Sequence, residues 1–276
     1  MNLSTLFADG DYRFQMGLRR GSASEFFRPT AQHDELSRER QHWLQTEPEK
    51  YFAFLPTAEP LLDEALALAR EWETITAEQH DTLATIATPA ERMKRFGEVW
   101  EPDLLLLRAN AVGRFELVGG CVCFPSSWSL AEKVGQPMEF IHAPVPGLNA
   151  QLGRSIDSFL AKLTPGAAWL RHNWGLSRSP ELNQHPSRPL PRLDASVTLA
   201  GLWLRVEQQA LVALPQTGGV LFAIRIAMLP LTEVKRDTTT AERLAHALHT
   251  MPATVAAYKG LATARERVVD LLDDAN

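Results

Sequence analysis

The sequence predicts an α+β protein, built on a five-stranded antiparallel sheet with helices on one face and helical extensions at both ends. Apolar residues at helical spacing dominate both ends of the chain, whereas the middle holds apolar runs separated by glycine turns. The chain has 276 residues, of which 45% are hydrophobic and 22% charged, as in an ordinary globular protein. We therefore divide it into an N-terminal, largely helical extension (1–100), a core (101–235) and C-terminal helices (236–276).

The N-terminal extension begins with a loop-rich segment and then reads as three helices, over 34–46, Glu59–Ile75 and Pro89–Val99. The second is the clearest, because a broad apolar stripe runs along it and two acidic residues, Asp63 and Glu64, suit its first turn. The stripe consists of Leu61, Leu62, Ala65, Leu66, Leu68, Ala69 and Trp72.

The core begins with two strands within 103–125, which a turn near Val112 and Gly113 joins. A short helix is then expected to end at Gly135. An amphipathic helix follows over Asn149–Gly166, where a Pro-Gly pair closes it.

The rest of the core predicts a strand over 168–177 and a hairpin over 202–231, turned by "PQTGG". Between them, the Pro-rich loop 179–196 is long enough to be a functional candidate. This order of elements is that of a PAS-like module, although many α+β folds share it. Two helical segments, 239–251 and 253–275, complete the chain.

Composition and motifs exclude several classes of protein. The net charge of −5 argues against a general nucleic-acid-binding surface, and no apolar run approaches the roughly 20 residues that cross a bilayer. The N-terminus lacks a basic start followed by an apolar run, so we expect no secretory signal and a cytoplasmic protein. The sequence contains no G-x-G-x-x-G, P-loop or G-x-S-x-G motif.

The two cysteines, Cys121 and Cys123, lie two residues apart on a predicted strand. Neighbours so close on one strand make poor disulfide partners, and their spacing is not that of a zinc site. We expect buried, reduced thiols. Two cysteines also cannot supply the four ligands of an ordinary iron–sulfur cluster.

A lone histidine, His142, stands in "MEFIHAPVPG", before two prolines that restrict the backbone. Taken alone, this pattern fits either a core residue at a bend or a metal ligand held at a set angle.

Three strand segments carry polar residues at unusual positions. In "LRHNWGL", alternation sends Arg171 and Asn173 to one face and His172 and Trp174 to the other. These polar residues either pair with loop backbone or serve a function. In "WLRVEQQ", Arg205 and Glu207 share a face with Trp203 and Gln209, as a surface pair or as anchors in a cavity. Arg225 is a lone charge in an apolar strand, so it is either paired or meets an anionic ligand.

Read together, the segments resemble a known family. The motifs "MGLRRG", "CVCFPSSW", "EKVGQP", "IHAPVPG", "RHNWGL", "LRVEQQ" and "LPQTGGVLFAIRI" are similar, in order and spacing, to those of the haem-dependent oxidative N-demethylase family, specifically its haem-binding PAS-like subunit. The resemblance spans roughly residues 10–255. It departs at Gln208, where the family commonly has a basic residue within "RVERQ".

The resemblance implies a PAS-like fold that holds haem b and uses it to activate O2. It implies oxidative removal of a methyl group from a small secondary amine such as dimethylamine, with release of formaldehyde. NADPH, FMN and a 2Fe–2S cluster supply the electrons in such systems. Because this chain lacks a dinucleotide motif and enough cysteines, a separate reductase protein is the expected partner. The sequence leaves open whether the chain forms a homo-oligomer.

The resemblance also suggests roles for individual residues. His142 is the expected metal ligand, with His172 as the alternative. The other expected cofactor-binding residues are Arg171, Asn173, Trp174 and Arg205, and the expected catalytic residues are Glu207 and Arg225. Two alternatives remain open: a haem-binding PAS-like sensor, and a non-catalytic homologue that has or has lost the haem.

Overall fold

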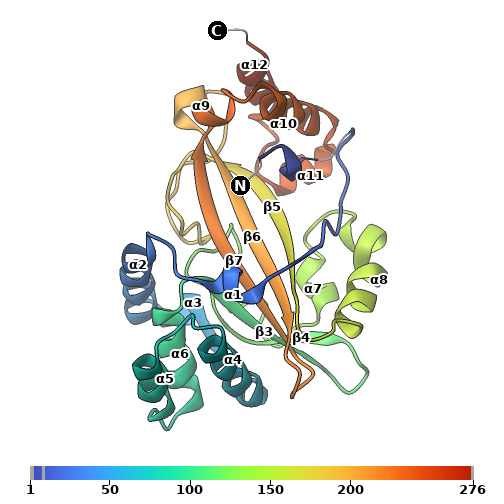
Figure 1. The fold of residues 1–276 in the computed structure, drawn as a ribbon. Helices are drawn as coiled ribbons and strands as arrows, with labels where there is room; N and C mark the ends of the chain where they lie inside the picture. The colour runs from blue at the N-terminus through green and yellow to red at the C-terminus, as the bar shows by residue number, and fades with distance from the viewer. Residues whose placement is uncertain (1–2, 8–9, 275–276) are drawn as a thin grey trace.

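The computed structural model describes residues 3–7 and 10–274, which form one seven-stranded antiparallel sheet flanked by helices (Figure 1). The strand order is β1-β5-β6-β7-β3-β4-β2. The strands are β1 (Arg19–Gly21), β2 (Phe52–Phe54), β3 (Asp103–Ala109), β4 (Phe115–Cys121), β5 (Ala168–Ser177), β6 (Trp203–Ala213) and β7 (Val220–Pro230).

The five long strands lie where the sequence predicts them, but the expected count of five is wrong. Two strands of three residues each, β1 and β2, extend the sheet at its two edges. Strand β1 pairs with Ala168–Leu170 of β5, and β2 pairs with the end of β4. A three-residue strand is too short to show alternation, so the sequence pattern could not reveal either one.

Helices cover both faces of the sheet, whereas the sequence predicts helices on one. Along β3, Leu104 and Leu106 join one apolar cluster, and Leu105 and Leu107 join another on the opposite side. The uninterrupted "LLLL" is therefore the mark of a strand buried on both faces. We call the side of Leu104 the α4 face and the side of Leu105 the α8 face, after the helices that cover them.

The α4 face is covered by the N-terminal helices: α1 (Ala23–Phe27), α2 (His33–Thr46), α3 (Pro48–Tyr51), α4 (Glu59–Glu71), α5 (Ala77–Ala84) and α6 (Pro89–Val99). Helices α2 and α6 confirm the prediction, and α4 ends four residues before the expected Ile75. Helix α5 was not predicted, although Thr76 and Gln79 form a capping box at its start.

The α8 face is covered by α7 (Met138–His142) and α8 (Leu148–Ala161). The segment ending at Gly135 is a turn rather than the expected helix, and Gly135 adopts a φ of +77°. That left-handed conformation favours glycine and ends the turn before α7 begins.

The C-terminal helices are α9 (Leu231–Val234), α10 (Thr238–Thr250), α11 (Ala253–Tyr258) and α12 (Arg265–Asp273). They pack on one end of the sheet around Leu204, Val206 and Trp174 (Figure 1). The single helix expected over 253–275 is interrupted at Gly260, whose φ is +70°. Three short 3-10 helices, η1 (Leu3–Leu6), η2 (Pro56–Ala58) and η3 (Leu199–Gly201), complete the elements.

Both cysteines are buried and free, as their spacing predicts. Burial raises the pKa of the Cys121 thiol to about 12 and that of Cys123 well above its usual value. Neither thiol is therefore a ready metal ligand. Among the described residues, no helix has the length and apolar character needed to span a membrane.

Candidate functional site

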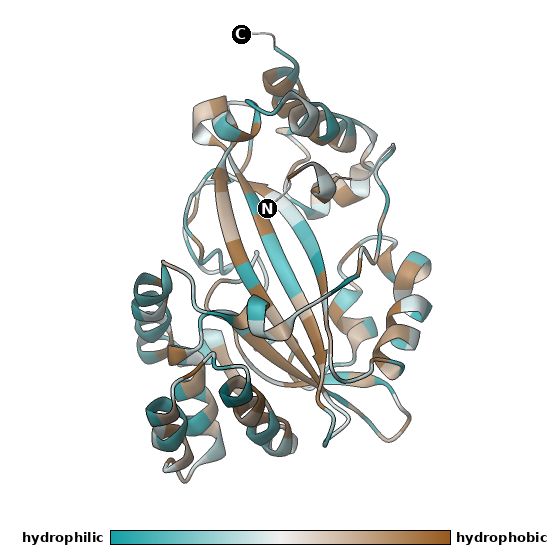
Figure 2. Ribbon diagram, in the orientation of Figure 1, coloured by the Kyte–Doolittle hydropathy of each residue, from teal (hydrophilic) through white to brown (hydrophobic). Residues whose placement is uncertain are grey.

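A polar band crosses the α8 face in the middle of β5 and β6, and Figure 2 shows hydrophilic residues at the centre of these strands. The strand register sets Arg171 opposite Gln209, Asn173 opposite Glu207 and Gly175 opposite Arg205. Opposed residues in an antiparallel pair share a face. The motifs that contain Asn173 and Glu207, 34 residues apart in the chain, therefore form one continuous surface across the β5–β6 pair.

Glu207 lies at the centre of this surface, with a relative exposure of only 8%. Its Oε2 accepts hydrogen bonds from Asn173 Nδ2 at 3.2 Å and from Gln209 Nε2 at 2.8 Å. Its Oε1 has no hydrogen-bond partner in the part of the chain that the structure describes. The carboxylate is therefore held through one oxygen and offers the other.

Two cations lie near this carboxylate. The Nε of Arg171 is buried and has no hydrogen-bond partner among the described residues. Burial lowers the pKa of Arg171, although the charge of Glu207 acts in the opposite direction. An unpartnered buried donor is costly, so it marks a position where a ligand group can bind.

Lys259, at the end of α11, supplies the second cation. Its Nζ donates a hydrogen bond of 2.6 Å to the Trp174 carbonyl and lies 5.2 Å from the centroid of that indole ring. Burial lowers the pKa of Lys259 to about 8, with Glu207 opposing the shift and Arg171 adding to it. Positive charge therefore exceeds negative charge around Glu207, which suits an anionic ligand group.

His142 is the last residue of α7, directly before the segment that contains Pro144 and Pro146. Its imidazole has no hydrogen-bond partner among the described residues. Burial lowers the pKa of His142 to about 4, and the charges of Arg171 and Lys133 add to this effect. The ring is thus neutral at pH 7, and a nitrogen lone pair is available to a metal.

Gly175 leaves open space on the same face. A Cβ built on this residue would meet no atom within 4 Å, and its φ is not positive, so backbone conformation does not require glycine. A glycine inside a strand often marks a place where a ligand approaches the backbone. Next to the polar band, Ile226 lies opposite Glu207 and Ile224 opposite Gln209, and both belong to the apolar cluster of the α8 face together with Trp128, Met138 and Ile141.

These features fit the expected haem. A neutral imidazole suits the iron, the unpartnered Arg171 and the nearby Lys259 suit the haem carboxylates, and apolar walls suit the macrocycle. The open space at Gly175 provides room next to the polar band.

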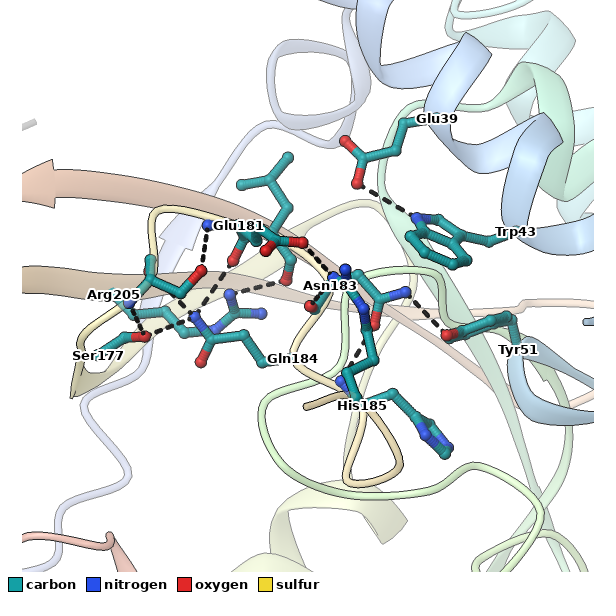
Figure 3. A network of polar contacts seen from close by, with 12 residues as sticks. Glu39, Trp43, Tyr51, Ser177, Glu181, Asn183, Gln184, His185 and Arg205 are labelled. Carbon is teal, nitrogen blue, oxygen red and sulfur yellow. Dashed lines mark hydrogen bonds and ion pairs between the residues drawn. The ribbon is translucent and has the colours of Figure 1, made fainter. Parts of the chain in front are cut away.

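Arg205 lies on the same face, but its guanidinium is fully used by the protein. Figure 3 shows Arg205 beside Glu181, Asn183 and Gln184 of the Pro-rich loop. It donates to Ser126 Oγ at 2.7 Å, to the Leu182 carbonyl at 2.8 Å and to the Phe124 carbonyl at 2.7 Å. Burial lowers its pKa to about 10. Arg205 therefore fastens two loops to β6, including the Pro-rich loop singled out in the sequence.

The structure places Arg225 on the α4 face, with the sheet between it and Glu207. Its guanidinium forms an ion pair with Glu101 and donates to the carbonyls of Phe26 and Arg28, each at 2.9 Å. Gln208 lies opposite Arg225 in the register, so the departure from the family pattern faces away from the polar band.

Trp174 and His172 also point to the α4 face. The Trp174 ring packs edge-on against Phe7, with centroids 5.1 Å apart. Its backbone carbonyl, rather than its ring, accepts the hydrogen bond from Lys259.

Sequence reasoning missed Lys259, Gly175 and the role of Gln209. The position of Gln209 beside Glu207 could be predicted, because the two residues are two apart on one strand and share a face. Gly175 stood inside a motif that was singled out for its other residues. Lys259 gave no signal, since only the docking of α11 brings it to β5.

A sequence model of the family described as haem-dependent oxidative N-demethylase, alpha subunit-like, matches residues 68–269. The match is well over half of the chain's 276 residues and includes every residue of the polar band, together with His142 and Lys259.

Proposed function

Because the chain belongs to the haem-dependent oxidative N-demethylase, alpha subunit-like family, we propose that it binds haem b on the α8 face and demethylates a small secondary alkylamine there. The family supports a haem-dependent oxidative N-demethylase-like function. Dimethylamine as the substrate, formaldehyde as a product and the residue roles below are our proposal.

The observation that carries the proposal is the state of His142. A neutral imidazole without a protein hydrogen bond lies at the end of a helix on the same face as the free oxygen of Glu207. The side chain is half-buried and its ring nitrogens make no hydrogen bond to a described residue, so they are accessible to a ligand group. His142 would ligate the iron, and Arg171 and Lys259 would bind the haem carboxylates.

When bound, haem supplies the activation of O2. The balanced reaction consumes dimethylamine, one O2, two electrons and two protons, and it yields methylamine, formaldehyde and one water. One C–N bond is broken, the methyl carbon is oxidised and dioxygen is reduced.

Glu207 is the residue that we assign to the substrate. An alkylamine is protonated at neutral pH, and Oε1 can accept a hydrogen bond and then the proton from the ammonium group. Asn173 and Gln209 keep the carboxylate oriented through Oε2. Arg205, Trp174 and Arg225 would act only by holding the surrounding loops and strands in place.

The electrons must come from outside the chain. The described cysteines are both buried with raised pKa values, and the sequence has no dinucleotide motif. We therefore propose a separate reductase that carries FMN and a 2Fe–2S cluster and oxidises NADPH. The five long strands would form a PAS-like core for the haem.

Haem binding is the first test. Purified protein titrated with haem should develop a Soret band, and His142→Ala should lower the haem affinity at least about tenfold. His172→Ala is the matched control, because its side chain lies on the opposite face. The absence of haem binding by the unmodified protein would overturn the proposed function, and equal affinity in both variants would exclude His142 as the ligand.

Turnover is the second test. With haem bound, dimethylamine should shift the absorption spectrum, and formaldehyde should appear when electrons and O2 are supplied. A haem protein that responds to O2 or carbon monoxide but not to the amine would instead be a gas sensor.

A further inference from the structure

We propose that the pocket between α8 and the β1–β5 edge of the sheet is the docking site for the acidic electron-donor protein, an inference that rests on the proposed function. The pocket has a volume of about 530 Å³. Its lining residues are Leu18, Arg154, Ser155, Ser158, Phe159, Lys162, Leu163, Thr164 and Trp169. Figure 1 shows α8 beside this edge of the sheet.

The pocket has an apolar floor with aromatic character. Phe159 and Trp169 meet edge-on, with ring centroids 5.7 Å apart, and Leu18 and Leu163 lie beside them. Each of the two rings is only partly buried. Aromatic side chains surrounded by polar groups are typical of the centre of a protein interface.

The rim is cationic. Arg154 of α8 and Lys162, the residue directly after this helix, are exposed, and exposed Arg20 lies opposite Trp169 in the β1–β5 register. None of the three forms an ion pair within the described residues. No acidic residue lines the pocket, and Asp157, nearby on α8, forms no ion pair with a described residue. Unpaired cations around apolar rings favour a partner with carboxylates around an apolar patch.

The position of the pocket indicates which acidic partner fits. Trp169 points to the α8 face, two residues before Arg171 on β5, which corresponds to about 7 Å along a strand. A protein docked here would stand next to one of the proposed haem-carboxylate residues. Because electrons must enter from outside, a redox protein is the partner that this location serves.

The test uses the haem-loaded protein and a purified acidic 2Fe–2S ferredoxin of the plant type, reduced before mixing. Stopped-flow absorption then follows haem reduction under carbon monoxide. The variant Arg154→Glu/Lys162→Glu should reduce at least about tenfold more slowly at low salt, because electrostatic steering sets such association rates. The unmodified protein should slow strongly as salt rises, and the variant should not.

A matched control is Arg38→Glu/Arg267→Glu, which makes the same charge change at exposed positions on α2 and α12. Its rate should stay within about twofold of the unmodified protein. Equal rates of haem reduction in the two double variants would overturn the docking site. It would also be overturned if the pocket bound only a small anion and its occupation left the rate of reduction by ferredoxin unchanged.

A haem-free arm separates this inference from the proposed function. Carbodiimide should cross-link Lys162 of the haem-free protein to ferredoxin carboxylates in preference to Lys94 and Lys235, and mass spectrometry identifies the linked residues. Cross-links spread evenly over all lysines would contradict the docking site even if haem binds. A specific Lys162 cross-link without any Soret band would support the surface while refuting the haem function.

Discussion

Lys259 caps the open edge of β5 by donating a hydrogen bond of 2.6 Å to the backbone carbonyl of Trp174. Strand β1 pairs only with Ala168–Leu170, so among the described residues no strand lies on that side of the rest of β5. The ammonium group thus takes the place of a neighbouring strand at one point. It also brings a charge from the C-terminal helices to the polar band around Glu207.

Lys259→Met should leave the free energy of unfolding at pH 7 within about 1 kcal/mol of the unmodified value, because the lowered pKa shows that burying this charge offsets its contacts. The pKa of Lys259 is about 8 in the folded protein and 10.5 for an ordinary lysine, which stands for the unfolded chain. Between these two pH values the unfolded chain therefore binds more protons than the folded protein. The unmodified protein should therefore gain stability across that range relative to the variant. Haem affinity should fall about tenfold.

Urea denaturation at pH 7, 8.5 and 9.5 measures the first effect, and haem titration measures the second. Lys162→Met makes the same chemical change at an exposed site. If the unmodified protein instead lost stability relative to Lys259→Met as the pH rises, the buried position of the Lys259 ammonium group would be contradicted.

Glu207→Gln should weaken dimethylamine binding at least about tenfold, because a hydrogen bond to a charged group is lost. Spectral titration of the haem-loaded protein measures this affinity. Haem retention should not change, since Glu207 is not assigned to the cofactor. Gln209→Met, which removes only a positioning donor, should cost several-fold less. Equal affinities for Glu207→Gln and the unmodified protein would remove Glu207 from the substrate site.

Gly175→Leu should fill the space next to the polar band and lower haem affinity at least about tenfold. Stability should stay within about 1 kcal/mol, because the new Cβ meets no atom and a strand glycine is itself unfavourable. Gly175→Ala should also lower haem affinity, but by less, because its side chain is smaller. Haem titration and urea denaturation are the measurements, and undiminished haem affinity in the leucine variant would place the haem elsewhere.

Arg225→Met should lower the free energy of unfolding by about 3–5 kcal/mol, because it removes the guanidinium that pairs with the buried Glu101 carboxylate. Among the described residues, that carboxylate then keeps only its contacts with the Thr30 N–H and His33. Haem and amine affinities should not change, since the sheet separates Arg225 from Glu207. The double variant Arg225→Met/Glu101→Gln should recover part of the stability. A stable Arg225→Met protein that fails to bind the amine would restore the catalytic role that the sequence suggested.

His185→Gln should reduce the loss of stability in acid. His185 is buried in the Pro-rich loop, its Nε2 has no partner among the described residues, and burial lowers its pKa below the usual 6.5. Below pH 6.5 the unfolded chain therefore binds more protons, and the unmodified protein loses up to about 1.4 kcal/mol per pH unit through this group.

Urea denaturation at pH 7.5, 6.5 and 5.5 compares the two slopes. Exposed His249→Gln is the control, and parallel slopes for His185→Gln and the unmodified protein would refute the prediction.

The sequence could predict which residues share a face within each strand, because side chains alternate with a period of two. It placed Arg171 with Asn173, and Glu207 with Gln209, correctly. Alternation does not say which faces of two strands coincide, so the hydrogen bond from Asn173 to Glu207 needed the register. Arg225 looked like a lone charge because its partner, Glu101, is distant in sequence.

Long, periodic elements were predictable and short ones were not. Helix α6 has the expected bounds, since Pro89 opens it and the apolar spacing is clear. Strands β1 and β2 offer no periodicity in three residues each. The same limit hid the second helical layer, because a run of four leucines fits a strand buried on one side or on two.

The open edge of β5 has a consequence for handling the protein. Unpaired backbone groups along an edge strand can recruit a second copy and begin aggregation. Lys259 and the exposed Arg19 and Arg20 place positive charges along this edge, and like charges repel an identical neighbour. High salt weakens that repulsion, so concentrated stocks should remain clear longest in dilute buffer.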